Sequence, residues 1–448
     1  MRHLPAGWAL GFMFFGIASA LTFGSARILT FILSVGFLLA GLALDFFRTD
    51  LRYAMPREVS QQNPFIWLTL TYLVVVGQGV WINGLDVDSV LRSLSGGVLI
   101  LGATLASHRG LAIHPTLLRM GLLGYLAAGV IVGFAGSATS PCRSDKCSPV
   151  GVLYKGGFTH ENMMGWAAVL SAIVLLGSVV RRRDRRFLLL ALASLSLGLA
   201  VLSGARTSLY AGVATAVAFG GVMLFRRWRT AVAATVPILC SGVGLYLIHR
   251  AQVEDFSTRG RRWVVIRDSL DGVTSVFGHG LTAWVDLQPQ FAIPTSTHSV
   301  YGAILIQGGL LALVPFTMFL VVATRRAQQS GALEVVVLLH FVAFQAIMET
   351  VWEPSVLVQR GWVLVALAMT IPAGYSPARG RRIQPPEHRS YVDVRHHPYR
   401  SPQSVDVTRE TRVSHEVALR QQHTEQLQLG LTAPARHREP ARHRGLSA

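Results

Sequence analysis

Apolar stretches long enough to cross a bilayer recur along most of this 448-residue chain. A helix needs about 20 apolar residues to cross the hydrocarbon core, whereas a membrane β-barrel would show alternating segments of about ten residues. Hydrophobic residues make up 51% of the chain and charged residues only 14%, too few to cover a soluble protein of this length. The pattern predicts an all-α integral membrane protein with about twelve transmembrane helices, at residues 6–23, 28–47, 64–82, 90–106, 117–135, 163–180, 187–203, 207–225, 230–248, 299–323, 332–352 and 356–373.

The arginines between these spans indicate the orientation of the chain. Basic residues follow the second, fourth, sixth, eighth and tenth predicted spans. Basic loops of membrane proteins stay in the cytoplasm, so both the N-terminus and the C-terminus are predicted to be cytoplasmic. The arginines concerned are Arg48, Arg52, Arg57, Arg109, Arg181, Arg182, Arg183, Arg185, Arg186, Arg226, Arg227, Arg229, Arg325 and Arg326.

The composition divides the chain into a polytopic transmembrane domain, residues 1–374, and a tail, residues 375–448. In the predicted topology the two long loops of the first part, 136–162 and 249–297, face outward. The tail is rich in Arg, His, Pro and Gln, so we expect it to be disordered and cytoplasmic. Its charge either attracts anionic lipids or only anchors the topology. The net charge of +18 lies in loops and tail, which argues against a nucleic-acid partner.

The three cysteines give little indication of redox or metal chemistry. Cys240 falls inside an apolar span and is expected to be a core residue. Cys142 and Cys147 share one polar loop, where their spacing permits a disulfide if the loop faces an oxidising compartment, and both states stay open. No Cys/His group has the spacing of metal ligands, so neither a metal nor a cofactor is expected.

The external loop 249–297 gathers several arginines on a predicted helix from Ser257 to Gly280. Arg259 lies at its start, and Arg262 and Arg267 flank an apolar stripe. Such a helix would lie in the outer interface with its arginines at headgroup level. Guanidinium groups bind phosphate in a bidentate way, and the simpler alternative is contact with native lipid phosphates. The stripe consists of Trp263, Ile266, Leu270 and Val273.

Two further residues are candidates for chemistry next to these arginines. His298 follows the arginine-rich loop and precedes an apolar span, where it could accept a proton near neutral pH or only anchor the span. Arg206 lies in a tight external turn, where a positive charge opposes the topology trend. A bound anion would account for it.

Four other polar residues lie at or inside spans. His160 and Asn162 begin the span at 163–180, where they either hydrogen-bond a sugar or cap the helix. Glu349 is near the outer end of the span at 332–352 and is expected to pair with an external arginine. His340 is deeper in the same span and is expected to make a structural hydrogen bond.

Four stretches carry a resemblance to a known family. In chain order they are Gly157-Phe158-Thr159-His160-Glu161-Asn162-Met163-Met164-Gly165; Leu202-Ser203-Gly204-Ala205-Arg206-Thr207-Ser208; Ser257-Thr258-Arg259 with Trp263 and Gly278-His279-Gly280; and Thr297-His298-Ser299-Val300-Tyr301 with Gly308-Gly309-Leu310-Leu311. Together they resemble the O-antigen ligase and polymerase superfamily of bacterial envelope glycosyltransferases, over residues 150–325. Ser299 stands where that family usually has asparagine, and Gln307 where glutamate is common.

The resemblance implies a GT-C-like ligase or polymerase architecture in the cytoplasmic membrane, with its active site on the external face. It implies a metal-independent, inverting transfer of a glycan from undecaprenyl diphosphate to a glycan, lipid or protein acceptor. Arg206 and Arg259 would hold the diphosphate, assisted by Arg262 or Arg267, and His298 would orient or deprotonate the acceptor. His160 and Asn162 would contact substrate.

Other classes of membrane protein fit parts of the pattern. Twelve spans also suit a polysaccharide or lipid transporter or flippase, which usually carries charged residues near the bilayer midplane. A glycan polymerase of the shape-and-division type shares the layout and the lipid-carrier substrate. A non-catalytic scaffold would leave the external arginine and histidine cluster without a purpose.

Overall fold

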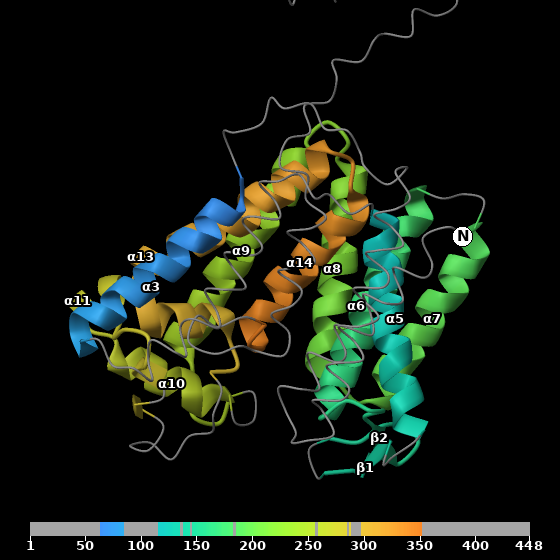
Figure 1. Ribbon diagram of the computed structural model, residues 1–448, viewed down its shortest axis with the longest axis horizontal. Helices are drawn as coiled ribbons and strands as arrows, with labels where there is room; N and C mark the ends of the chain where they lie inside the picture. The colour runs from blue at the N-terminus through green and yellow to red at the C-terminus, as the bar shows by residue number, and fades with distance from the viewer. Residues whose placement is uncertain are drawn as a thin grey trace, which may run out of the picture. The chain divides into compact units, whose positions relative to one another are not determined.

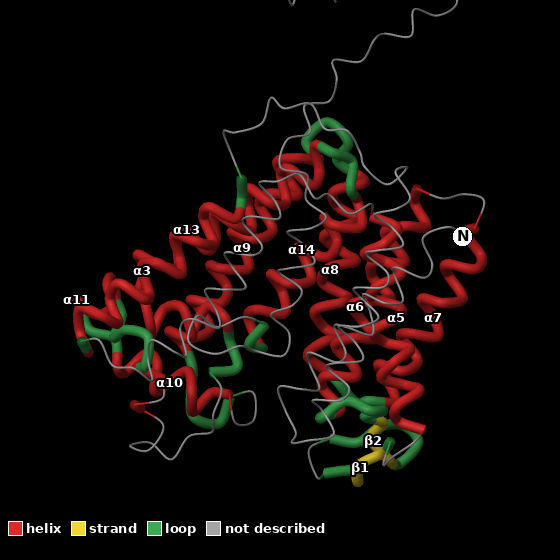
Figure 2. Tube along the Cα trace, viewed as in Figure 1, coloured by secondary structure: helices red, strands yellow, loops and turns green. Residues whose placement is uncertain are grey.

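The computed structural model describes residues 63–84, 115–134, 138–143, 146–181, 185–255, 259–284, 286–287 and 297–351. This part of the chain is mostly helical (Figure 1). Its helices are α3 (Phe65–Asn83), α5 (Pro115–Phe134), α6 (Glu161–Arg181), α7 (Arg186–Leu202), α8 (Arg206–Leu224), α9 (Arg229–Arg250), α10 (Arg259–Ser269), α11 (Gly272–Phe277), α13 (Val300–Gln329) and α14 (Leu333–Met348). Two short antiparallel strands, β1 (Thr139–Pro141) and β2 (Val152–Tyr154), form a hairpin before α6 (Figure 2).

The long helices fall where the apolar runs predict spans. Five of them are long and apolar enough to cross a membrane, at Phe65–Ile82, Glu161–Val180, Arg206–Leu224, Arg229–Arg250 and Val300–Gln329. Shorter apolar helices occupy Leu118–Phe134, Arg186–Leu202 and Leu333–Met348. The chain is therefore a multi-span helical membrane protein. The predicted spans at 6–23, 28–47, 90–106 and 356–373, both termini and the tail lie outside the described residues.

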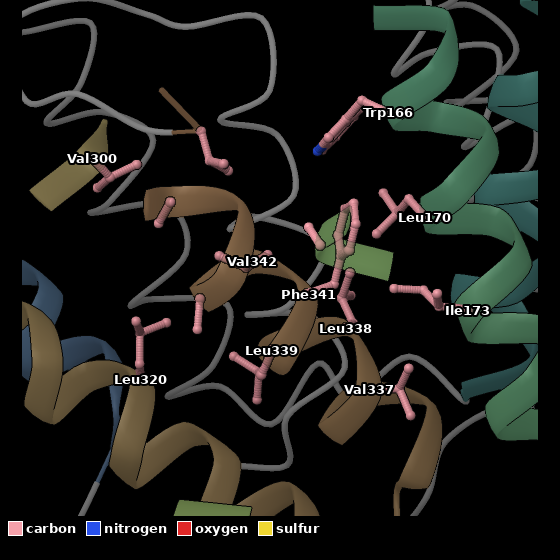
Figure 3. Packing of buried hydrophobic residues seen from close by; sticks show 14 of the residues in the cluster. Trp166, Leu170, Ile173, Val300, Leu320, Val337, Leu338, Leu339, Phe341 and Val342 are labelled. Atoms are coloured by element: carbon pink, nitrogen blue, oxygen red, sulfur yellow. The ribbon is translucent and has the colours of Figure 1, made fainter. Parts of the chain in front are cut away.

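Helix α14 forms the centre of the packing, between α6 on one side and α13 on the other (Figure 3). Leu338 and Phe341 of α14 face Leu170 and Ile173 of α6 in this view, whereas Leu339 faces α13. All of these side chains are buried. Since α14 also contacts α8 and α9, the residue that follows it is placed where several helix ends meet.

A proline inside α9 explains a histidine deep in α14. Pro237 has no backbone N–H, so the carbonyl of Ala233, four residues earlier, loses its helical partner. The His340 ring donates from Nε2 to that carbonyl at 3.0 Å. The predicted structural role of His340 is confirmed, because the ring satisfies a backbone group that lipid cannot.

A break inside α13 receives the Gly-His-Gly triplet of the preceding loop. Gly309 has a φ of 60°, so the helical hydrogen bonds are interrupted there. The freed carbonyls of Ile306 and Gln307 accept hydrogen bonds from the amides of His279 and Gly280, at 2.8 and 2.9 Å. Two of the four sequence motifs thus meet through their backbones.

The single helix predicted from Ser257 to Gly280 is wrong in its second half. The chain divides into α10 and α11 because Asp271 caps α11 and forms a capping box with Thr274. Trp263 and Ile266 are buried as the stripe predicts, but Val273 is exposed. Arg262 is buried against the protein rather than exposed beside the stripe.

Candidate functional site

The turn between α7 and α8 places Arg206 and Thr207 at the start of α8. Gly204 has a φ of 62°, a left-handed conformation that favours glycine and allows the tight reversal. The Ser203 hydroxyl donates to the carbonyl of Ala200 and accepts from the amide of Ala205, which fixes the turn internally. The Arg206 side chain is exposed at this end of the helices, and Thr207 is half-buried behind it.

Arg259, the first residue of α10, connects this turn to the end of α14. Its Nη2 atom donates to Thr207 Oγ1 at 3.0 Å and to Glu349 Oε1 at 2.8 Å. Glu349 directly follows α14 in an extended conformation, and its side chain is only 6% exposed. The predicted pairing of Glu349 with an arginine from the loop after α9 is confirmed.

His298 lies on the other carboxylate oxygen of Glu349, with 3.5 Å between Nδ1 and Oε2. Its φ is 53°, and it is the one non-glycine residue with positive φ among the residues that the structure describes. A side chain in this conformation costs about 1 kcal/mol or more, and such strain gathers at functional sites.

The neighbours of His298 hold it in this strained conformation. Thr297 Oγ1 lies 3.3 Å from Thr350 Oγ1, and Ser299 Oγ donates to the carbonyl of Ala346 at 3.2 Å. Ser299 also caps α13 by accepting from the amide of Gly302. Serine is among the residues preferred at this capping position, and asparagine would fill it equally well.

Arg262 is buried one turn beyond Arg259, with 4% of its surface exposed. Among the described residues its Nε and Nη1 atoms have no hydrogen-bond partner. Burial lowers the pKa of this guanidinium from its ordinary value to about 10. The nearby charge of Arg259 also lowers it, and Glu349 opposes the change. A buried cation without a bound counter-charge is costly, which makes this position attractive to an anion.

A second polar cluster surrounds the start of α6. His160 caps this helix, since its Nδ1 accepts from the amide of Asn162 at 3.1 Å. Glu161 forms ion pairs with Arg143 at 3.3 Å and with Lys146 at 3.2 Å. Lys146 also donates a hydrogen bond to Asn162 Oδ1 at 2.5 Å. Of the two roles predicted for His160, capping is confirmed; contact with a sugar stays a prediction, as it does for Asn162.

The two clusters influence each other electrostatically. Burial lowers the pKa values of Lys146 and His160, and the carboxylate of Glu349 is close enough to oppose both shifts. In Figure 1 the β1–β2 hairpin and α10 lie at the same end of the helices. The hairpin cluster and the cluster around Arg259 therefore border one region.

Not all of the predicted residues join this network. Arg259, Arg262 and His298 lie together around Glu349. Arg206 belongs to the same turn as Thr207, but its exposed guanidinium has no partner of its own in the described contacts. Arg267 donates instead to Asp268 and to the carbonyl of Ala251. It thus ties α10 to the end of α9.

The sequence did not single out Thr207 or Lys146, and it predicted for Glu349 a pairing with an arginine but no contact with His298. Glu349 joins Arg259 to His298, and Thr207 and Lys146 support them from neighbouring elements. The position of Glu349, an acidic residue at the end of an apolar span, is the sequence feature that indicates a role for it. The disulfide between Cys142 and Cys147 is formed, which settles the open alternative. Within the described ranges, no group of three His, Cys, Asp or Glu side chains could hold a metal ion.

No family model, curated protein or solved structure matches this chain.

Proposed function

We propose that this protein is a membrane glycosyltransferase that transfers or polymerises an undecaprenyl-diphosphate-linked oligosaccharide at the outer face of the cytoplasmic membrane. The buried guanidinium of Arg262 carries the proposal. It lies beside a second arginine and a histidine–carboxylate pair at one end of the helices. A diphosphate would supply the missing counter-charge.

The proposed function requires that the end of the helices that carries His298 faces outward. About twelve spans with cytoplasmic termini would direct the His298 end of the helices outward. The basic turns support this orientation, because Arg226, Arg227 and Arg229 join the opposite ends of α8 and α9, and Arg326 lies near the opposite end of α13.

The residues suggest a division of labour in the transfer. Arg259 and Arg262, with Arg206 at the start of α8, would hold the diphosphate and stabilise the charge that grows as the glycosyl carbon–oxygen bond breaks. His298 would take the proton of the acceptor hydroxyl on Nε2 as that oxygen attacks from the opposite face, which inverts the anomeric centre. Glu349, on the Nδ1 side of the ring, would orient it and stabilise the imidazolium.

This arrangement favours a transferase over a transporter. The chief midplane candidate for a transport site, His340, is occupied with the carbonyl freed by Pro237. Arg259, Glu349 and His298 lie together instead at one end of the helices, where a lipid-linked diphosphate and a polar acceptor can meet. The acceptor is a glycan, a lipid or a protein hydroxyl.

Complementation of a deletion strain tests the proposal. Variants His298→Ala, Arg206→Ala and Arg259→Ala are compared with Arg250→Ala, an exposed arginine at the end of α9, at matched membrane abundance. The first three are expected to accumulate undecaprenyl-linked glycan and to lose the mature polymer, and Arg250→Ala to behave as wild type. Full polymer in all four strains would contradict the proposal.

A further inference from the structure

A disulfide in the loop between β1 and β2 places Lys146 against the end of the helices that carries Arg259, Glu349 and His298. Cys142 and Cys147 are joined, and between them Arg143 and Lys146 exchange two backbone hydrogen bonds, at 2.8 and 3.1 Å. The covalent link and this bridge restrict where Lys146 can lie. Its side chain is only 13% exposed, unusually low for a lysine.

The aliphatic part of Lys146 rests on the turn between α7 and α8. A Cβ atom added to Gly204 would lie 3.3 Å from Lys146 Cε and 2.8 Å from Leu153 Cδ2. Lys146 and β2 therefore cover the left-handed residue of this turn. Thr207 directly follows this turn at the start of α8 and accepts a hydrogen bond from Arg259.

The ammonium group of Lys146 fixes the other side of the same turn through α6. It binds Glu161 and Asn162 in the first turn of that helix. Further along α6, Gly165 contacts Ser203 and Ala205 so closely that a side chain there would overlap them. Lys146 thus joins α6 to the α7–α8 turn at the point where the turn has no side chain of its own.

We propose that Lys146, seated by the Cys142–Cys147 disulfide, is a positioning residue that holds the α7–α8 turn so that Thr207 meets Arg259. The catalytic consequence rests on the proposed function; the structural consequence does not. The arginine–carboxylate–histidine group is then assembled while Cys142 and Cys147 are joined and loosened when the two cysteines are replaced.

Hydrogen–deuterium exchange of the purified protein in detergent tests this directly. The amides of Arg206 and Leu209 donate to the carbonyls of Gly204 and Ala205 and report opening of the turn. In Lys146→Met, and in the double variant Cys142→Ser with Cys147→Ser, both amides are expected to exchange about tenfold faster. Loss of a charge-assisted contact changes a local equilibrium by that order.

The chain offers a matched control, because its only other lysine, Lys155, lies in the same segment. Lys155→Met is expected to leave the exchange of the turn unchanged. Lys146→Arg, which keeps the positive charge, should restore slow exchange. If the cysteine variant fails to accumulate, Lys146→Met decides the question, since it keeps the disulfide.

Unchanged exchange in Lys146→Met, or equal acceleration in Lys155→Met, would overturn the inference. An activity assay separates it from the proposed function. If the protein transfers glycan, turnover should fall about tenfold in Lys146→Met and return in Lys146→Arg. If the turn exchanges faster in Lys146→Met but the wild-type protein transfers no glycan, the positioning role is supported and only the proposed function is refuted.

Discussion

Replacement of Arg262 by methionine should stabilise the resting protein while it abolishes function. The pKa of this guanidinium falls well below its ordinary value, to about 10, chiefly through burial. At about 1.4 kcal/mol per pKa unit, the folded state disfavours its charge by roughly 3 kcal/mol. Methionine keeps much of the aliphatic stem and removes the charge. Because some packing is lost with the guanidinium, we expect a net gain of about 1–3 kcal/mol in the free energy of unfolding.

The measurement is unfolding of the purified protein in mixed micelles, with and without inorganic pyrophosphate as the probe. Arg250→Met, at an exposed position, is the control and should change stability by less than about 0.5 kcal/mol. Saturating pyrophosphate should raise the unfolding midpoint of the wild type, since a ligand stabilises the state that binds it. The midpoint of Arg262→Met should not move.

Destabilisation of Arg262→Met by 1 kcal/mol or more would refute this reasoning. It would mean that the guanidinium has a partner in the resting protein, supplied by segments outside the described residues. A rise of the midpoint with pyrophosphate in both wild type and Arg262→Met would place the anion elsewhere.

Three other predictions concern the same end of the helices. A double-mutant cycle of Arg259→Ala and Glu349→Ala should give a coupling of about 1–3 kcal/mol in micellar unfolding, because their 2.8 Å contact joins charged groups with little exposure; coupling below about 0.5 kcal/mol would contradict it. Burial lowers the pKa of His160, so the folded state favours the neutral ring, and stability should rise with pH from that lowered pKa up to about 6.5 and then level off. His160→Asn, which keeps a capping side chain, should flatten this rise, and an unchanged profile would exclude His160 as its source. His298→Gly should be more stable than His298→Ala by about 1 kcal/mol, because alanine retains the strain at φ 53° and glycine does not, and equal thermal midpoints would oppose this.

The span pattern is the part of the fold that the sequence predicts best. Apolar length alone places α8 at Arg206–Leu224 against a predicted 207–225, since helices in lipid must satisfy every backbone group internally. The break at Asp271 was also readable, because Asp271 and Thr274 have the spacing of a capping box. The prediction followed the apolar stripe alone and joined two helices into one.

The candidate site was predictable in its residue types but not in its connections. Arg259 and His298 were identified by their position in one loop, whereas their link through Glu349 depends on where α14 ends relative to α10. The burial of Arg262 likewise follows from the packing of α10 on α9 and α13, which a single helical pattern does not contain. Lys146 acquires its place from a disulfide whose formation the sequence left open.

Release of free polyprenyl diphosphate is the most direct test of the central claim. Lipid-linked glycan extracted from the deletion strain would be reconstituted with the purified protein in liposomes and followed by mass spectrometry, with and without a chelator. We predict release of polyprenyl diphosphate and a glycosylated acceptor by the wild type, and neither product from His298→Ala. Movement of the intact lipid-linked glycan across the bilayer, with no release of polyprenyl diphosphate, would contradict the account and identify a flippase instead.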